Sequence, residues 1–179
     1  MPQSSTNATR EIVAPIIVAA EMGAADQAWA DALRRRHYPP ERNHLAAHIT
    51  LLRHLAPSLQ GELQMLLKSL TNAPRPRVTV GKIYSLGEGV AIGLHSPDLI
   101  DIWSLLAARF EHYLTPQDQH QPRLHITVQN KASPQVAKAT LAELEAATMP
   151  RRIVMTGLAY WHYRGGPWSL IGRYAFRAR

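Results

Sequence analysis

Apolar residues recur along the chain with two different periods, and this predicts a mixed fold of strands and helices. Runs rich in Ile and Val are typical of buried strands, whereas apolar residues three and four positions apart are typical of one helix face. Prolines and glycines separate these segments, as Pro39 and Pro40 do after the first helix. The expected helices cover residues 24–37, 57–70, 97–114 and 134–147, and the expected strands cover 11–22, 45–55, 78–86, 90–95, 123–130, 153–163 and 168–176.

The expected elements repeat in the same order. Strand–helix–strand–helix–strand occurs twice, and the middle strand reads His-Ile-Thr-Leu over residues 48–51 and His-Ile-Thr-Val over 125–128. Such self-similarity indicates an internal duplication. We therefore expect a duplicated α+β fold with two lobes and a basic central groove. The expected organisation is a disordered tail over residues 1–10 and one bilobal domain over 11–179, with repeats at about 11–86 and 89–177.

The two repeated strands carry the same candidate chemistry. Side chains two positions apart in a strand share a face, so His48 lies beside Thr50 and His125 beside Thr127. A twofold duplication can bring these four side chains to one groove. Imidazoles accept and donate protons near neutral pH, and hydroxyls donate hydrogen bonds to phosphate oxygens. The set suits cleavage of a phosphodiester; the alternative is that the histidines are core residues capped by neighbouring threonines.

Composition and charge narrow the function further. Apolar residues make up 46% of the chain, which excludes disorder for most of it, and the net charge of +7 favours polyanionic ligands. The chain has no cysteine, which excludes disulfides, thiolate zinc sites and cysteine nucleophiles. It has no apolar run of about 18 residues and no secretory leader, so we expect a cytoplasmic protein without membrane contact. His44 or His54 could pair with His48, but no third ligand recurs at a metal-binding spacing, so we expect neither metal nor cofactor.

These motifs resemble those of the two-histidine (2H) phosphoesterase superfamily, in the branch of the bacterial 2′-5′ RNA ligase-like proteins. The signature of that group is a duplicated His-aliphatic-Thr/Ser-aliphatic motif, and the resemblance extends over residues 11–177. It implies two antiparallel-sheet lobes with outer helices around a central cleft. It also implies metal-independent hydrolysis of 2′,3′-cyclic phosphates on RNA 3′ ends or nucleotides, with a possible reverse 2′-5′ ligase reaction. By the same resemblance, His125 activates water and His48 protonates the departing 3′-oxygen to leave a 2′-phosphate, with Thr50 and Thr127 at the phosphate.

Basic residues near the motifs are candidate contacts to the phosphate. Relatives often carry one five positions after each motif histidine; Arg53 matches this place, but the second half has Asn130 there and Lys131 one position later. Arg123 shares a strand face with His125 and is a further candidate. We interpret the basic run over 34–36 as a solvated helix end, where cations complement the helix dipole.

Aromatic residues around the closing turn at 165–167 are candidates for stacking on a nucleobase, above all Tyr160 and Trp168. Two other functions remain open from the sequence. One is a non-catalytic module that binds RNA or nucleotides, although binding alone does not require two titrating imidazoles. The other is hydrolysis of a small cyclic phosphate such as an ADP-ribose derivative. We expect a monomer in each case.

Overall fold

The computed structural model describes residues 14–150 and 152–177, where the chain forms seven strands and four α-helices. Their order is that of the expected repeat, while the expected N-terminal tail lies outside the described residues. The elements are β1 (Ile16–Met22), α1 (Ala24–His37), β2 (Ile49–Leu55), α2 (Gln60–Leu70), β3 (Arg77–Ser85), β4 (Val90–His95), α3 (Pro97–Arg109), β5 (His125–Gln129), α4 (Pro134–Ala146), β6 (Arg152–His162) and β7 (Ser169–Ala175).

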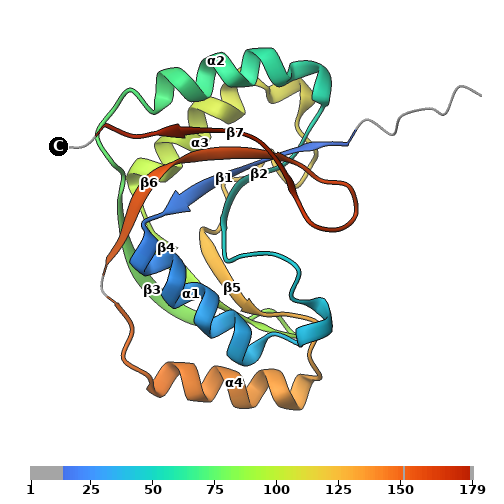
Figure 1. Ribbon diagram of the computed structural model, residues 1–179, viewed down its shortest axis with the longest axis vertical. Coiled ribbons are helices and arrows are strands. Elements are labelled where there is room, and N and C mark those ends of the chain that lie inside the picture. The colour runs from blue at the N-terminus through green and yellow to red at the C-terminus, as the bar shows by residue number, and fades with distance from the viewer. Residues whose placement is uncertain (1–13, 151, 178–179) are drawn as a thin grey trace, which may run out of the picture.

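The strands form one antiparallel sheet that is divided into two lobes. Its order is β2-β1-β6-β3-β4-β5, and β7 pairs with β6. Strand β6 belongs to both lobes, because residues 152–154 pair with β3 whereas residues 155–162 pair with β1. Figure 1 shows β6 crossing from the lobe of β1, β2 and β7 to the lobe of β3, β4 and β5. The two lobes confirm the expected bilobal α+β fold.

Each lobe is assembled from both halves of the chain. Strand β3 closes the first repeat but pairs with β4 of the second, while β6 closes the second repeat and pairs with β1 of the first. The helices follow the same rule, since α2 and α3 lie together on one side of the molecule and α1 lies toward α4 on the other (Figure 1). Ion pairs join the helices within each pair, Arg109 with Glu62 and Arg36 with Glu143. The duplicated halves are therefore interlocked.

Local signals in the sequence explain where two of the helices begin. The Ser96 hydroxyl accepts a hydrogen bond from the Leu99 N–H at 3.1 Å, and the Ser133 hydroxyl accepts one from the Val136 N–H at 3.4 Å. In both helices a proline follows the cap, where its missing N–H costs nothing. Helix α3 ends at Arg109 rather than at residue 114, because the chain turns there and buries Phe110 completely.

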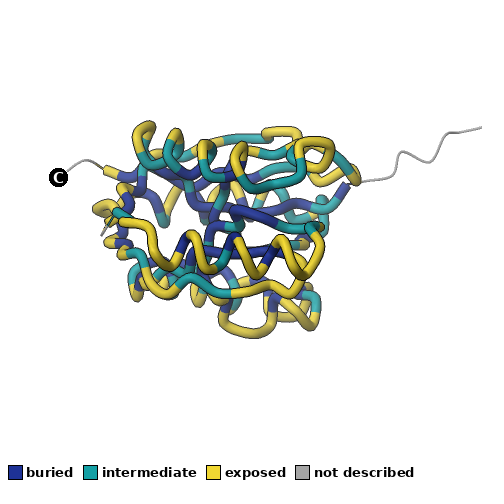
Figure 2. The backbone as a smooth tube through the Cα atoms, turned by 90° about the horizontal axis from the view of Figure 1, so that it is seen from below, coloured by how far each residue is buried: buried dark blue, intermediate teal, exposed yellow. Residues whose placement is uncertain are grey.

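A continuous apolar core lies between the helices and the sheet, and its largest members come from both halves of the chain. Figure 2 shows buried residues along the interior segments and exposed residues along the outer turns of the helices. Fully buried residues include Leu63 and Leu67 from α2 together with Leu99 and Leu106 from α3. This shared core makes the two lobes one packing unit.

Asp118 is a buried carboxylate that ties the loop before β5 to β2. It is 1% exposed, and its Oδ2 accepts hydrogen bonds from the backbone N–H groups of Arg53 at 2.8 Å and His54 at 2.9 Å. The pairing of β2 with β1 is irregular between Leu52 and Leu55, so these N–H groups fall outside the regular hydrogen bonds between the two strands. The carboxylate supplies the missing acceptors.

Replacing Asp118 by alanine should lower the free energy of unfolding by about 2 kcal/mol, because two backbone donors lose a charged acceptor. Urea unfolding monitored by circular dichroism measures the change. The exposed neighbour His120→Ala is the matched control and should leave the midpoint within experimental error. A similar stability for Asp118→Ala and His120→Ala would contradict the assigned role.

Candidate functional site

The two repeated motifs occupy equivalent places in the two lobes. His48 directly precedes β2 and His125 is the first residue of β5, so the strand expected over 45–55 begins only at Ile49. Strands β2 and β5 are the two ends of the sheet order, yet they contact each other. Each motif threonine lies opposite an alanine of the neighbouring strand, Thr50 opposite Ala19 and Thr127 opposite Ala91. The duplication therefore extends to the cross-strand neighbours of the motifs.

Both motif histidines are held by the same hydrogen bond. Nδ1 of His48 lies 2.8 Å from the carbonyl oxygen of Ala46, and Nδ1 of His125 lies 2.6 Å from that of Arg123. A carbonyl oxygen only accepts, so Nδ1 is the donor in each ring. In the neutral ring Nε2 then carries the lone pair. Both imidazoles thus have the tautomer in which Nε2 can take up a proton.

Burial makes both rings poor proton acceptors in the structure. Burial lowers the pKa of His48 to about 4, and the positive charges of Arg34 and His125 act in the same direction. The hydrogen bond to Ala46 acts in the opposite direction. The pKa of His125 is also lowered by burial, opposed by the hydrogen bond to Arg123 and helped by the charges of Arg53 and Arg123. The charge of His125 is among those that lower the pKa of His48, in agreement with the contact between β2 and β5.

Arginines from both lobes lie near His125. Arg53 projects from β2 and contacts the Asp118 carboxylate at 3.5 Å, while Arg123 lies over the Tyr84 ring at 3.3 Å from its centroid. Tyr84 in turn meets the His125 ring edge-on, with centroids 6.1 Å apart. Burial raises the pKa of Tyr84 against the opposing charges of Arg123 and Arg53. Two of the predicted phosphate contacts are thus brought to the same histidine.

Arg34 is a buried residue of the site that the sequence interpretation missed. Its guanidinium donates from Nη1 to the carbonyl oxygen of Thr127 at 2.8 Å and from Nη2 to Oδ1 of Asn43 at 2.9 Å. Arg34 is 4% exposed, and its guanidinium carbon lies 4.3 Å from the centroid of the Tyr38 ring. The interpretation of residues 34–36 as a solvated helix end is therefore wrong for Arg34. The helical spacing of Ala30 and Arg34, which share the buried face, was the available signal.

Lys131 and Tyr160 lie apart from the motifs. Lys131 is exposed in the turn after β5, has a φ of 62°, and donates its backbone N–H to the side chain of Asn130. Tyr160 is 2% exposed and its ring stacks on Tyr174. Trp168 does meet the site, with its ring centroid 4.4 Å from that of His48. Among the predicted substrate contacts, the structure thus brings Arg53, Arg123 and Trp168 to the motifs.

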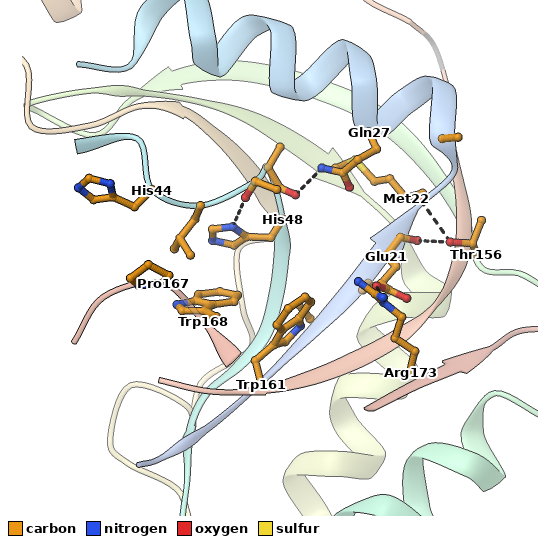
Figure 3. A pocket seen from close by; sticks show the side chains of 16 residues that line it. Glu21, Met22, Gln27, His44, His48, Thr156, Trp161, Pro167, Trp168 and Arg173 are labelled. Carbon is orange, nitrogen blue, oxygen red and sulfur yellow. Dashed lines mark hydrogen bonds and ion pairs between the residues drawn. The ribbon is translucent and has the colours of Figure 1, made fainter. Parts of the chain in front are cut away.

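A pocket of about 570 Å³ opens beside His48. It contains no residue of the second motif and therefore lies on one side of the histidine pair. In Figure 3, Trp168 and Pro167 lie next to His48, Trp161 follows, and Glu21, Arg173 and Thr156 lie at the other end. The lining residues are Ala19, Ala20, Glu21, Met22, Ala24, Gln27, His44, Leu45, Ala46, Ala47, His48, Thr156, Trp161, Pro167, Trp168 and Arg173.

Residues 14–150 and 152–177 contain neither a cluster of metal ligands nor a helix that could span a membrane. No three His, Asp or Glu side chains there lie together in an arrangement that could hold a metal ion. No helix in this part of the chain combines the length and the apolar character needed to cross a membrane.

The sequence model of the 2′-5′ RNA ligase superfamily matches residues 23–167, which is most of the chain and includes both motifs. The chain belongs to this superfamily. The resemblance inferred from the two His-x-Thr motifs is thereby confirmed, and with it the kinship to phosphoesterases and RNA ligase-like proteins. A search of curated protein sequences finds no match.

Solved structures of E. coli LigT and of a Thermus thermophilus protein share this fold. E. coli LigT in complex with 3′-AMP matches with a TM-score of 0.61 and 20% identity over 91% of this chain and 98% of LigT. LigT in complex with phosphate matches with a TM-score of 0.58, 20% identity and coverage of 91% and 97%. The protein TT0787 of Thermus thermophilus matches with a TM-score of 0.59 and 15% identity over 92% of this chain and 99% of its own.

The depressed pKa of His48 in this superfamily member gives a measurable pH dependence. In an NMR titration the His48 ring should change protonation near pH 4, below the value of about 6.5 for a free histidine. Between these values the folded protein binds fewer protons than the unfolded chain, so the free energy of unfolding should fall as the pH is lowered through this window.

The variant His48→Gln identifies the resonance and removes this contribution. Its stability should therefore decline less steeply between about pH 6.5 and 4 than that of the parent protein. A His48 titration midpoint at or above 6.5, or equal slopes for the two proteins, would contradict the assigned environment.

Proposed function

We propose that the protein is a phosphodiesterase that hydrolyses 2′,3′-cyclic phosphates on RNA 3′ ends or nucleotides to 2′-phosphates, without a metal ion. His48 and His125 act as the acid–base pair. When an RNA 5′-hydroxyl attacks the cyclic phosphate in place of water, the same P–O bond to the 3′-oxygen breaks and a 2′-5′ linkage forms reversibly. The observation that carries the proposal is the shared hydrogen bond of both Nδ1 atoms to backbone carbonyls, at 2.8 and 2.6 Å. It leaves both Nε2 atoms available for proton transfer, whereas a binding site requires no such matched pair.

Hydrolysis of a cyclic phosphate needs two proton transfers on opposite sides of phosphorus. A base takes a proton from water while the new P–O bond forms, and an acid gives a proton to the ribose oxygen while the old P–O bond breaks. Two imidazoles can supply both steps in one turnover. The threonine hydroxyls two residues along each strand donate hydrogen bonds to the non-bridging oxygens as negative charge develops there.

The position of the pocket supports one assignment of the two roles. A nucleoside seated in the pocket lies on the His48 side of the phosphate, so its ribose oxygen faces His48 and the attacking water faces His125. His48 is then the acid and His125 the base. This agrees with the roles implied by the family resemblance, although the two arguments are independent. The choice of the 3′-oxygen as the leaving group follows that resemblance.

The charges around the site favour an anionic substrate. Arg53 and Arg123 lie near His125, and Arg34 lies near His48. A bound phosphodiester acts against the burial and the positive charges that lower the pKa of each imidazole. His48 therefore gains its proton together with the substrate anion. The complexes of LigT with 3′-AMP and with phosphate support a ligand of this kind.

Replacing either motif histidine by alanine should lower kcat on a nucleoside 2′,3′-cyclic phosphate by about 10²-fold or more, as expected for loss of a general acid or base. The double variant should be little slower than either single variant, because the two groups act as one unit. The assay is performed in excess EDTA, and the exposed His120→Ala serves as the control.

A substrate with a good leaving group separates the two roles. It should restore turnover in His48→Ala but not in His125→Ala, because only the acid becomes dispensable. Rescue of His125→Ala alone would reverse the assignment. Full activity of both single variants would exclude the mechanism, and loss of all activity in EDTA would exclude a metal-independent reaction.

Replacing Thr50 or Thr127 by valine removes the hydroxyl and keeps the shape of the side chain, and so tests the role of each hydroxyl. Each change should lower kcat by about 10²-fold, the scale for losing one donor to a developing oxyanion. Thr79→Val, on an exposed position of β3, is the control. Unchanged turnover in Thr50→Val and Thr127→Val, with unchanged circular dichroism, would limit these hydroxyls to a structural role.

A further inference from the structure

The pocket lies beside one row of residues across the lobe of β2, β1, β6 and β7, and two members of this row, Ala19 and Arg173, line it. Thr50 lies opposite Ala19, Ala19 opposite Ala159, and Ala159 opposite Arg173. Residues directly opposite each other in adjacent strands share a face, so these four side chains point the same way. Three strand spacings separate the ends of the row by roughly 14 Å. The distance suits a nucleotide whose phosphate lies at Thr50 and whose base reaches toward Arg173.

In the other lobe a larger side chain occupies the equivalent position of the sheet. Its row runs from Thr127 to Ala91 and then to Tyr84, so a tyrosine stands where the first lobe has Ala159. The Tyr84 ring is further covered by Arg123 at 3.3 Å. The alanines of the first lobe leave room for a pocket of about 570 Å³, which is within the range of small-molecule sites.

Two indole rings form an aromatic wall of the pocket. The ring centroids of Trp161 and Trp168 lie 6.3 Å apart, and Trp168 also contacts His48 at 4.4 Å. Nucleobases stack on such rings through their π faces. Stacking here places a base next to the catalytic histidine, but by itself it does not distinguish one base from another.

A carboxylate and a guanidinium at the far end of the pocket can make that distinction. Glu21 Oε1 accepts a hydrogen bond from Nε of Arg173 at 2.5 Å, and Glu21 is largely buried, with a side chain only 24% exposed. Within the described chain, Glu21 Oε2 and the two terminal nitrogens of Arg173 have no hydrogen-bond partner. The pocket thus offers acceptors beside donors along one edge.

We infer that this pocket selects guanine, an inference that rests on the proposed function for the identity of the phosphate. Guanine has two adjacent donors, N1–H and the N2 amino group, which match the Glu21 carboxylate. Its O6 and N7 acceptors match an arginine. Adenine and cytosine place an unprotonated ring nitrogen against the carboxylate, and uracil flanks its single N–H with two carbonyl oxygens. The substrate class is therefore guanosine 2′,3′-cyclic phosphate, free or at the end of RNA.

Binding of the 2′-monophosphates of guanosine and adenosine, followed by quenching of tryptophan fluorescence, tests the inference without turnover. Guanosine 2′-monophosphate should bind about tenfold or more tightly, since a bidentate contact to a base discriminates by about 1–3 kcal/mol. Glu21→Gln replaces one acceptor by a donor and should bring the ratio of the two dissociation constants close to one. The exposed Glu145→Gln on α4 is the matched control and should keep the ratio.

Turnover of the four nucleoside 2′,3′-cyclic phosphates separates this inference from the proposed function. Guanosine preference in binding with no hydrolysis of any substrate would leave the base pocket standing and overturn the phosphodiesterase. Equal binding of both nucleotides, or an unchanged ratio in Glu21→Gln, would overturn guanine selection. Arg173→Met removes the donors to O6 and should also reduce the ratio, which keeps the test open if Glu21→Gln does not fold.

Discussion

The exchange of third strands between the two halves determines where every other element can lie. Because β3 pairs with β4 and β6 pairs with β1, each lobe needs strands from both repeats. Strands β2 and β5 then become the two ends of the sheet, and its curvature brings these ends into contact. The motif histidines are carried at this contact, so the site exists only when both lobes are complete. The site therefore depends on the pairing of strands from both halves.

Local patterns predicted much of the fold and the centre of the site. Alternation in a strand depends only on neighbouring residues, which is why His48 with Thr50 and His125 with Thr127 could be paired from the sequence. The cap signals at Ser96 and Ser133 are local too, and they are confirmed in the structure. The prediction that α3 ends at residue 114 was wrong, because the burial of Phe110 depends on the core that surrounds it.

Residues whose role depends on distant partners were not predictable in the same way. Arg34 bonds to the carbonyl of Thr127, 93 positions along the chain, and its helical spacing from Ala30 indicates a shared face but not this partner. The face of β6 on which an aromatic residue lies depends on strand register. Tyr160 therefore packs in the core while its neighbour Trp161 lines the pocket. Tertiary packing sets both outcomes.

Tyr84 in the second lobe has a consequence for the direction from which the proposed substrate enters the site. Two equivalent motifs have no inherent polarity, and the proposed substrate, a cyclic phosphate, could approach them from either lobe. Tyr84 fills on one side the volume that Ala159 leaves open on the other. Under the proposed mechanism, this difference in side-chain volume lets the substrate bind from one lobe only. The two equivalent imidazoles then take different roles. Under that mechanism the internal duplication supplies two equivalent groups, and one bulky ring gives them distinct tasks.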